Sequence, residues 1–304
     1  PGMWSKILDL KECFLQEEPS NEIRLAVRDY AIKNGLDFYD VKNQEGFLRT
    51  LMLRQNSKGE WMVLFQLYRE EKENRENLFN FVLEKFPQIK TLVFAINPKG
   101  NDSIYDLDIQ NYYGEGFLME EMDGLQFKIG PKSFFQTNYK QALELYRKTI
   151  EFAEISENDV VYDLYTGTGT IAQYIAKKAK YVIGIESVQE AIDAAIEHAK
   201  LNGLENCEFH CGDMKDVFTE EFLANHPKAD VLITDPPRDG MHQKVVEQIL
   251  KLSPPKIVYV SCNSATQARD LALMKEHYNV VKILPVDMFP QTHHVENIAL
   301  LVKK

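Results

Sequence analysis

Up to about residue 130, segments with helical spacing of apolar positions are mixed with short, dense apolar runs. Residues 21–35 have apolar positions three and four apart and end at Gly35, which predicts a helix with a glycine stop. Two apolar runs, 46–54 and 60–68, flank the turn sequence Q-N-S-K-G, which indicates a hairpin. A further helix and a further strand are predicted at 77–86 and 91–97. We therefore expect a small α+β unit.

From about residue 133, apolar runs of strand length alternate with segments of helical spacing. The predicted strands are 160–164, 181–186, 207–213, 229–237 and 256–262, and the predicted helices are 139–153, 171–179, 189–203 and 245–250. Such alternation indicates βαβ crossovers and a parallel, doubly wound α/β sheet. The last two runs, 279–285 and 297–303, have no helix between them and should pair as an antiparallel hairpin. A parallel sheet closed by an antiparallel strand resembles the class I, Rossmann-like methyltransferase fold.

A glycine turn, D-L-Y-T-G-T-G, lies between the first strand of this alternation and the following helix. Gly167 and Gly169 allow the backbone to approach a ligand closely at this point. A plain tight turn has the same pattern, so the turn alone is a weak signal.

Acidic residues strengthen that signal, because they stand at four successive strand ends. They are Asp163, Glu186, Asp213 and Asp235. The carboxyl ends of parallel strands meet at one edge, and Glu186 has the offset at which an acid reaches ribose hydroxyls. Four carboxylates suit a cationic ligand without phosphate, such as S-adenosyl-L-methionine. The alternative is that the acids are helix N-caps.

Cys262 follows an apolar run, I-V-Y-V-S, that has the composition of a buried strand and ends in the turn S-C-N-S. A cysteine in such a place is commonly a small buried hydrophobe. At the carboxyl edge of a sheet it can instead be a nucleophile. The residue alone leaves both interpretations open.

The turn D-P-P-R, at 235–238, ends the strand that precedes Cys262. Its prolines remove backbone donors and stiffen the turn. Related turns in other methyltransferases bind a planar exocyclic amine through an aromatic residue. Arg238 replaces that aromatic residue here, which favours a flat base over an amine as the target.

Uracil C5 is a target whose methylation uses a cysteine. A thiolate that adds to C6 turns the ring into an enolate, C5 then accepts the methyl group, and a base removes the C5 proton. Glu296, in H-H-V-E-N before the last strand, returns to the same edge and is the candidate base. A solvated loop acid is the alternative for Glu296. We expect His293 and His294 to be structural or to face RNA.

Composition limits the class of protein. The 304 residues are 44% hydrophobic, enough for a real core, and contain neither an apolar run of membrane-span length nor a visible signal peptide. The net charge of −11 argues against a large nonspecific nucleic-acid surface, but it leaves room for a local basic groove. Four scattered cysteines favour a reducing cytoplasm over a disulfide framework. The pair Cys207 and Cys211 lacks the second pair of a zinc site, so we expect no metal.

Five motifs together resemble the RNA uracil-5-methyltransferase family, which contains tRNA T-loop and 23S rRNA enzymes. They are F-F-Q-T-N, D-L-Y-T-G-T-G, D-P-P-R, S-C-N and H-V-E-N, and they occur in family order and spacing. The resemblance extends to the first 130 residues through Q-E-E-P-S-N-E-I-R and G-F-L-R. It covers nearly the whole chain.

The resemblance implies a role for each matching residue. Cys262 would be the nucleophile and Glu296 the proton acceptor, with Asp235 touching the cofactor or the target base. The positions that match cofactor contacts are Gln136, Tyr165, Thr170, Glu186 and Asp235, besides Gly167, Gly169 and Asp213 from the patterns above. Thr170 departs from the asparagine common in the family. Residues 1–132 would form a central domain that contacts RNA, and residues 133–304 the methyltransferase domain.

Two departures from the family concern the N-terminal part. Many members carry an N-terminal OB-like barrel, and this chain shows none. Ribosomal RNA members often hold an iron–sulfur cluster on four cysteines. In this chain only Cys13 stands at one of those four positions, the last, and one ligand cannot hold a cluster. The chain begins Pro-Gly, so we expect a fragment that lacks the N-terminal part.

The sequence therefore predicts an S-adenosyl-L-methionine-dependent 5-methyluridine RNA methyltransferase, with 23S rRNA favoured by Cys13 and the central region. A tRNA enzyme is the first alternative. A non-catalytic RNA-binding factor on the same fold is the second, and the set of Cys262, Asp235 and Glu296 argues against it. A cytosine-C5 enzyme is the third, but its P-C motif is absent. The sequence does not indicate an oligomeric state.

Overall fold

The computed structural model describes residues 8–290 and 292–304, and the chain divides into two compact units. The first unit comprises the described residues up to Glu120, with Lys128–Ser133, and the second comprises Glu121–Phe127 and Phe134–Lys304. The division expected from the sequence, at 132/133, places 121–127 in the first domain. In the structure this segment packs with the second unit, because Met122, Leu125 and Phe127 are buried in that unit's core.

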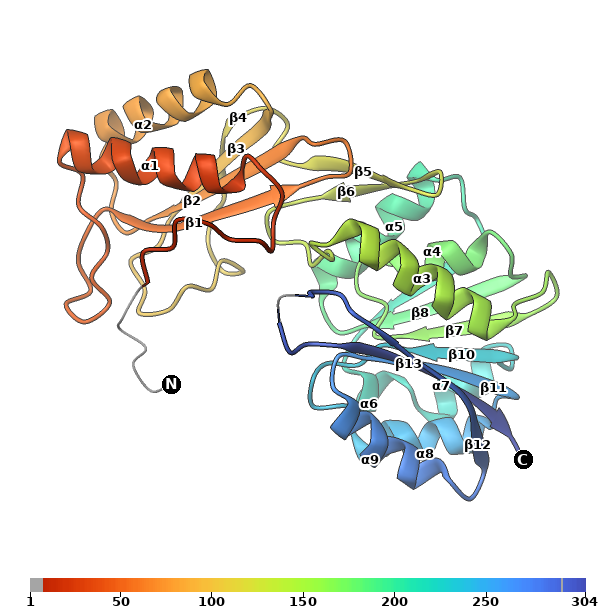
Figure 1. Cartoon of the computed structure of the whole chain (residues 1–304). Helices are drawn as coiled ribbons and strands as arrows, with labels where there is room; N and C mark the ends of the chain where they lie inside the picture. Colours follow the sequence, from red (N-terminus) through yellow and green to blue (C-terminus); the bar gives the residue numbers. More distant parts are fainter. Residues whose placement is uncertain (1–7, 291) are drawn as a thin grey trace. The chain divides into compact units, whose positions relative to one another are not determined.

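The first unit is a four-stranded sheet with two helices on one face (Figure 1). The strand order is β1 (Leu48–Gln55), β2 (Trp61–Leu67), β3 (Ile89–Ile96) and β4 (Gln110–Tyr113). The helices α1 (Ser20–Asn34) and α2 (Lys72–Lys85) contact each other, and α1 ends at Gly35, whose φ is 68°. The predicted hairpin and both predicted helices are confirmed.

Three short strands were not predicted. Besides β4, they are β5 (Leu118–Met122) and β6 (Leu125–Ile129), which pair only with each other. Their residues are few, and β4 has the sequence Q-N-Y-Y and is mostly exposed. Short and polar strands have too weak an apolar period to be recognised in a sequence.

The second unit is built on a seven-stranded sheet with the order β12-β13-β11-β10-β7-β8-β9. The strands are β7 (Val160–Leu164), β8 (Tyr181–Glu186), β9 (Cys207–Cys211), β10 (Val231–Thr234), β11 (Lys256–Ser261), β12 (Tyr278–Val286) and β13 (Glu296–Lys303). Strands β7 to β11 are parallel, and β13 is antiparallel to both of its neighbours. The predicted parallel sheet and its C-terminal hairpin are confirmed.

Helices cover both faces of this sheet (Figure 1). They are α3 (Tyr139–Ala153), α4 (Thr170–Ala176), α5 (Gln189–Leu201), α6 (Met214–Val217), α7 (Glu220–Asn225), α8 (Gln243–Leu252) and α9 (Ser264–Met274). Alternate strand residues face opposite cores: Val161 and Val258 lie with α3 and α4, whereas Tyr162 and Tyr259 lie with α6 and α8. Helices α6, α7 and α9 were not predicted, because they are short or, in α9, rich in small and polar residues.

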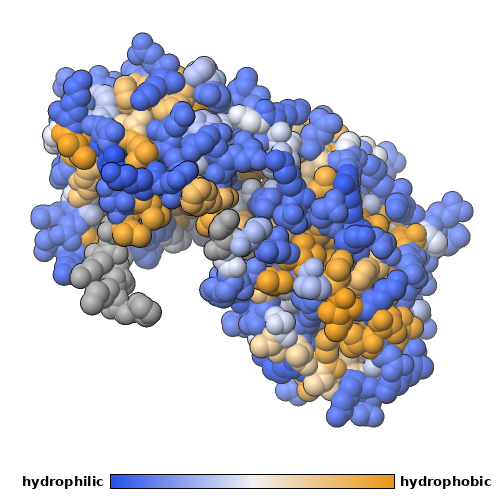
Figure 2. Space-filling model, viewed as in Figure 1, coloured by the Kyte–Doolittle hydropathy of each residue, from blue (hydrophilic) through white to orange (hydrophobic). Residues whose placement is uncertain are grey.

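Strand β12 is an edge strand, and it exposes apolar side chains. Val280, Val281 and Ile283 are all exposed, and Figure 2 shows apolar surface on the lower part of this unit. Across the described residues, no helix combines the length and apolar character needed to cross a membrane.

Candidate active site

The carboxyl edge of the second unit's sheet brings Cys262 and Glu296 together. Ser261, the last residue of β11, is paired with Asn297 of β13 in an antiparallel register. The paired register ends there, with Cys262 as the residue after Ser261 and Glu296 as the residue before Asn297. Directly opposed residues of antiparallel strands have Cβ atoms about 4.5–5.5 Å apart and side chains on the same face. Because Cys262 and Glu296 adjoin the last pair of these strands, the thiol and the carboxyl lie at the same edge, and the charge of Glu296 acts on the thiol.

The charges of Glu296 and the neighbouring Asp235 affect the pKa values in this cluster. Burial raises the pKa of the Cys262 thiol, and the negative charges of Glu296 and Asp235 raise it further. Burial also raises the pKa of the Glu296 carboxyl. The pKa of Asp235 is well above its usual range because of burial and of the charges of Glu296 and Asp163. Displaced pKa values in one cluster are typical of active sites, where proton transfer is tuned.

Arg238 opposes these shifts. Its positive charge lowers the pKa of both Cys262 and Glu296 and so favours the thiolate and the carboxylate. Hydrogen bonds connect the D-P-P-R turn to the residues after the cysteine: Asn263 Nδ2 and Thr266 Oγ1 each donate to the carbonyl of Arg238 at 3.1 Å. The two sequence motifs therefore form one hydrogen-bonded unit.

We expect the substitution R238Q to shift the ionisation of Cys262 to higher pH. The thiolate is the reactive form of cysteine, and removal of the nearby positive charge disfavours it. The test is the rate of Cys262 alkylation by iodoacetamide as a function of pH, resolved by peptide mass spectrometry. The exposed Cys211 is the internal reference. An unchanged midpoint for Cys262 would show that Arg238 does not act on the thiol.

Asp270 is a buried residue of this region that sequence reasoning missed. Its Oδ2 accepts hydrogen bonds at 2.8 Å from the Met241 backbone and the Tyr259 hydroxyl. Gly240 has a φ of 75°, and a Cβ there would lie 2.6 Å from the same oxygen. Asp270 thus holds the end of the D-P-P-R loop against β11, and no local motif marks it.

The glycine turn after β7 forms the second part of the site. Tyr165 has a φ of 64°, a left-handed conformation that is uncommon for a residue with a side chain and often marks a functional site. Gly167 also has a positive φ, and a Cβ built on it would meet nothing within 4 Å. The backbone at Gly167 is therefore open to a ligand. A Cβ on Gly169 would lie 2.8 Å from the Ala195 Cβ, so that glycine permits the packing of α5.

Glu186 and Asp163 flank this turn from different depths. The carboxylate of Glu186 accepts from the backbone N–H groups of Gly167 at 3.1 Å, Ser187 at 2.7 Å and Val188 at 3.0 Å. Asp163 is fully buried and accepts from Thr166 Oγ1 at 2.6 Å, and burial raises its pKa to about 7. Glu186 thus faces the open turn, whereas Asp163 supports the turn from inside the protein and does not line the edge.

The remaining candidates occupy three different environments. Asp213 is exposed, caps α6 by accepting from the Lys215 backbone at 3.2 Å, and pairs with the Lys215 side chain, so its N-cap interpretation is observed. Thr170 is buried, with its hydroxyl 3.4 Å from that of Thr168. Gln136 is half-buried in a loop that Asn138 anchors by donating to the Met288 carbonyl at 2.8 Å.

The loop before Glu296 carries His293 and His294, and the centroids of their rings are 4.1 Å apart. Burial and the charges of His293 and Arg238 lower the pKa of His294. The edge therefore combines a thiol, two carboxyls and an arginine with an open glycine turn. This set of groups can add a thiolate to a flat ring and remove a proton from it.

Comparisons with known proteins show the family to which the chain belongs. A family model described as tRNA (uracil-5-)-methyltransferase matches residues 74–304. The chain is 53% identical to an uncharacterized RNA methyltransferase of Porphyromonas gingivalis, over 100% of this chain and 66% of the relative. It is 51% identical to one of Bacteroides thetaiotaomicron, over 99% of this chain and 67% of the relative. The chain thus spans about two thirds of the length of these relatives.

A solved structure is similar over almost the whole chain. It is the crystal structure of the tRNA (uracil-54, C5)-methyltransferase of Pyrococcus abyssi in complex with S-adenosyl-L-homocysteine. It has a TM-score of 0.82 and 32% sequence identity, and it covers 98% of this chain and 71% of its own. The expected methyltransferase fold is thereby confirmed. By the family match and these similarities, the chain belongs to the tRNA (uracil-5-)-methyltransferase family.

Proposed function

We propose that this protein transfers a methyl group from S-adenosyl-L-methionine to C5 of a uracil in RNA. The observation that carries the proposal is that Cys262 and Glu296 adjoin the last pair of β11 and β13 at the carboxyl edge, where the charges of Glu296, Asp235 and Arg238 act on the thiol. Class I sheets bind ligands at this edge. Membership of the family supports the reaction, and the S-adenosyl-L-homocysteine bound to the Pyrococcus abyssi relative supports the methyl donor.

The mechanism begins with the Cys262 thiolate, which forms a bond to C6 of uracil and moves the electron pair of the C5–C6 double bond toward C5. S-adenosyl-L-methionine, when bound, supplies an electrophilic methyl group. After C5 has gained that methyl group, it still carries its proton, and the Glu296 carboxylate removes it. The electron pair of the C5–H bond restores the double bond, and the C6–S bond breaks to release the thiolate.

The residues around the glycine turn fit the methyl donor. Gly167 offers open backbone, and the Glu186 carboxylate lies beside it as an acceptor for ribose hydroxyls. Gln136, Tyr165 and Asp235 complete the proposed contacts. Gly169, Thr170 and Asp213 support the turn and α6, and we assign them a positioning role.

We further propose that the RNA is 23S rRNA, because Cys13 and the central region resemble those of ribosomal RNA members. A tRNA is the second candidate, and the similarity to the Pyrococcus abyssi tRNA enzyme favours it. The two candidates differ only in the RNA that presents the uracil.

The test of this function is methyl transfer under single-turnover conditions, with the chain in excess over RNA at low salt. The RNAs are unmodified transcripts of 23S rRNA and of tRNA, and the methyl donor is isotopically labelled. We expect label at C5 of uridine in the ribosomal transcript. Label only in tRNA selects the second candidate, and label in neither RNA, despite bound methyl donor, favours a non-catalytic RNA-binding factor.

A further inference from the structure

A second cluster of polar side chains lies away from the proposed active site, on edge strand β9 and the segment after α7. Glu208 and His210 are two residues apart in β9 and share one face, and His226 follows α7. One ligand atom of each residue lies within 4.8 Å of the others. Among the described residues, this is the one group of three such side chains with metal-ligand spacing.

Hydrogen bonds orient the groups of this cluster. His226 Nδ1 lies 2.7 Å from the carbonyl of Phe222, an acceptor, so Nδ1 carries the proton and Nε2 keeps a lone pair. The Tyr181 hydroxyl donates to Glu208 Oε2 at 2.7 Å, which leaves Oε1 for the histidines. In metal sites the ligands are typically held by such hydrogen bonds, from a histidine to a carbonyl and from a donor to a carboxylate.

The two distances from Glu208 to the histidines bracket the ligand spacing around a small tetrahedral ion. Oε1 of Glu208 is 2.9 Å from His210 Nε2 and 3.6 Å from His226 Nε2. Bonds of 2.0–2.1 Å to zinc place tetrahedral ligands about 3.3 Å apart, between these two values. The buried Nε2 of His210 also lacks the alignment that a hydrogen bond to Oε1 requires. All three ligand atoms lie within 4.8 Å of one another, which leaves an ion within reach of each side chain.

The surroundings leave a fourth position open. A surface cavity of about 440 Å³ is lined by Glu208 and His226 together with Lys180, Tyr181 and Asn225. On the other side, the Phe222 ring stacks on His226 at 4.0 Å and meets His210 edge-on at 4.9 Å. The Phe222 ring therefore borders the cluster on one side, and the surface cavity borders it on another, where a water can be the fourth ligand.

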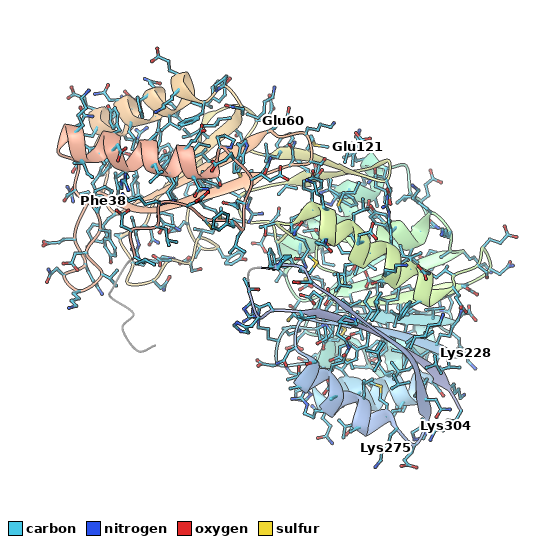
Figure 3. All side chains as sticks on the ribbon, viewed as in Figure 1. Phe38, Glu60, Glu121, Lys228, Lys275 and Lys304 are labelled. Carbon is cyan, nitrogen blue, oxygen red and sulfur yellow. The ribbon has the colours of Figure 1, made fainter. Side chains whose placement is uncertain are left out.

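The site is separate from the cysteines and from the proposed catalytic edge. Cys207 packs into the core on the opposite face of β9 from Glu208 and His210, because strand side chains alternate. The cavity is lined by Val160 and Tyr181, the first residues of β7 and β8. The cavity thus lies at the edge where the parallel strands begin, opposite the carboxyl edge. Figure 3 labels two residues at this edge: Lys228, which precedes β10, and Lys304, which follows the antiparallel β13.

The geometry points to a divalent metal site, of the kind that takes zinc, formed by Glu208, His210 and His226. Two imidazoles and one carboxylate are a common zinc ligand set. The ion would join edge strand β9 to the segment between α7 and β10. The proposal revises the expectation that the chain holds no metal, and it does not depend on the proposed methyl transfer.

The test is zinc binding by the chelator-treated chain, measured by calorimetry, with cobalt(II) absorption as a second readout. We expect one tight site per chain, and cobalt bands of tetrahedral coordination without thiolate charge transfer. The variant Y181F, which removes the hydrogen bond to Glu208, should weaken zinc binding roughly 10- to 100-fold. The variant H226Q, which removes a ligand, should weaken it more. The exposed His277 provides the control H277Q, which should bind as the wild type does.

Each other outcome decides against the site. Two results would show that the three residues form only an ion-pair cluster. One is that the wild-type chain does not bind zinc tightly, and the other is that H226Q keeps the wild-type zinc affinity and cobalt spectrum. Binding lost in C211S but kept in H226Q would assign the zinc to thiolates. If H226Q does not fold, E208Q decides in its place. Methyl transfer by H226Q should equal that of the wild type, which separates this result from a failure of the proposed function.

Discussion

Replacing Cys262 by alanine is expected to abolish methyl transfer to RNA. C5 of uracil is too weak a nucleophile to attack the methyl group of S-adenosyl-L-methionine. It becomes nucleophilic only when sulfur has formed a bond to C6. Removal of a covalent nucleophile typically costs a factor of about 10⁴ or more in rate, because the remaining groups act through it. The measurement is single-turnover transfer of labelled methyl groups to the RNA that the wild type modifies.

The affinity for the methyl donor separates this effect from damage to the fold. Cys262 directly follows β11, whereas the glycine turn and Glu186 belong to the β7–β8 region, so C262A should bind S-adenosyl-L-methionine as the wild type does. The variant E186A is the matched contrast, since it should lose donor affinity but keep a reactive Cys262. If C262A still methylates uridine, the covalent mechanism is wrong, and Cys262 is a small buried hydrophobe.

Much of the second unit could be predicted from its sequence, because each strand is a separate apolar run of ordinary length. The same patterns placed Glu186, Asp235 and Cys262 at the ends of parallel strands, and therefore at one edge. The absence of a helix between the last two strands predicted their hairpin, and β13 indeed begins at that edge with Glu296. Side-chain period and strand direction are local properties, so the sequence alone contains this information.

Interactions between distant segments could not be predicted in this way. Asp270 accepts a hydrogen bond from the Met241 backbone across about thirty positions of sequence and fills the space beside Gly240, and nothing in R-D-L-A-L marks it. Gly167 and Gly169 have the same sequence context in the turn. Only the structure shows that Ala195 occupies the space beside Gly169, whereas the space beside Gly167 is open. His226 likewise joins Glu208 only through the path of α7. Such pairs depend on packing and carry no periodic signal.

Replacing Glu296 by glutamine is expected to stop the reaction at a different point, with the RNA attached to the protein. An amide keeps the size of the side chain, but it cannot accept the C5 proton, so the C6–S bond cannot break. Addition itself should become easier, because the negative charge of Glu296 raises the pKa of the Cys262 thiol and E296Q removes that charge. A covalent adduct should then accumulate, visible as a slow band on a denaturing gel.

The adduct has two controls that locate the defect in proton removal. E276Q removes an exposed glutamate of the same unit and should turn over without a lasting adduct. RNA transcribed with 5-fluorouridine should trap even the wild type, because fluorine occupies the position of the C5 proton and cannot leave as a cation. Digestion of either trapped species should yield the same modified peptide, which contains Cys262. If E296Q instead turns over normally and traps nothing, another group removes the proton, and Glu296 serves only to raise the pKa of the Cys262 thiol.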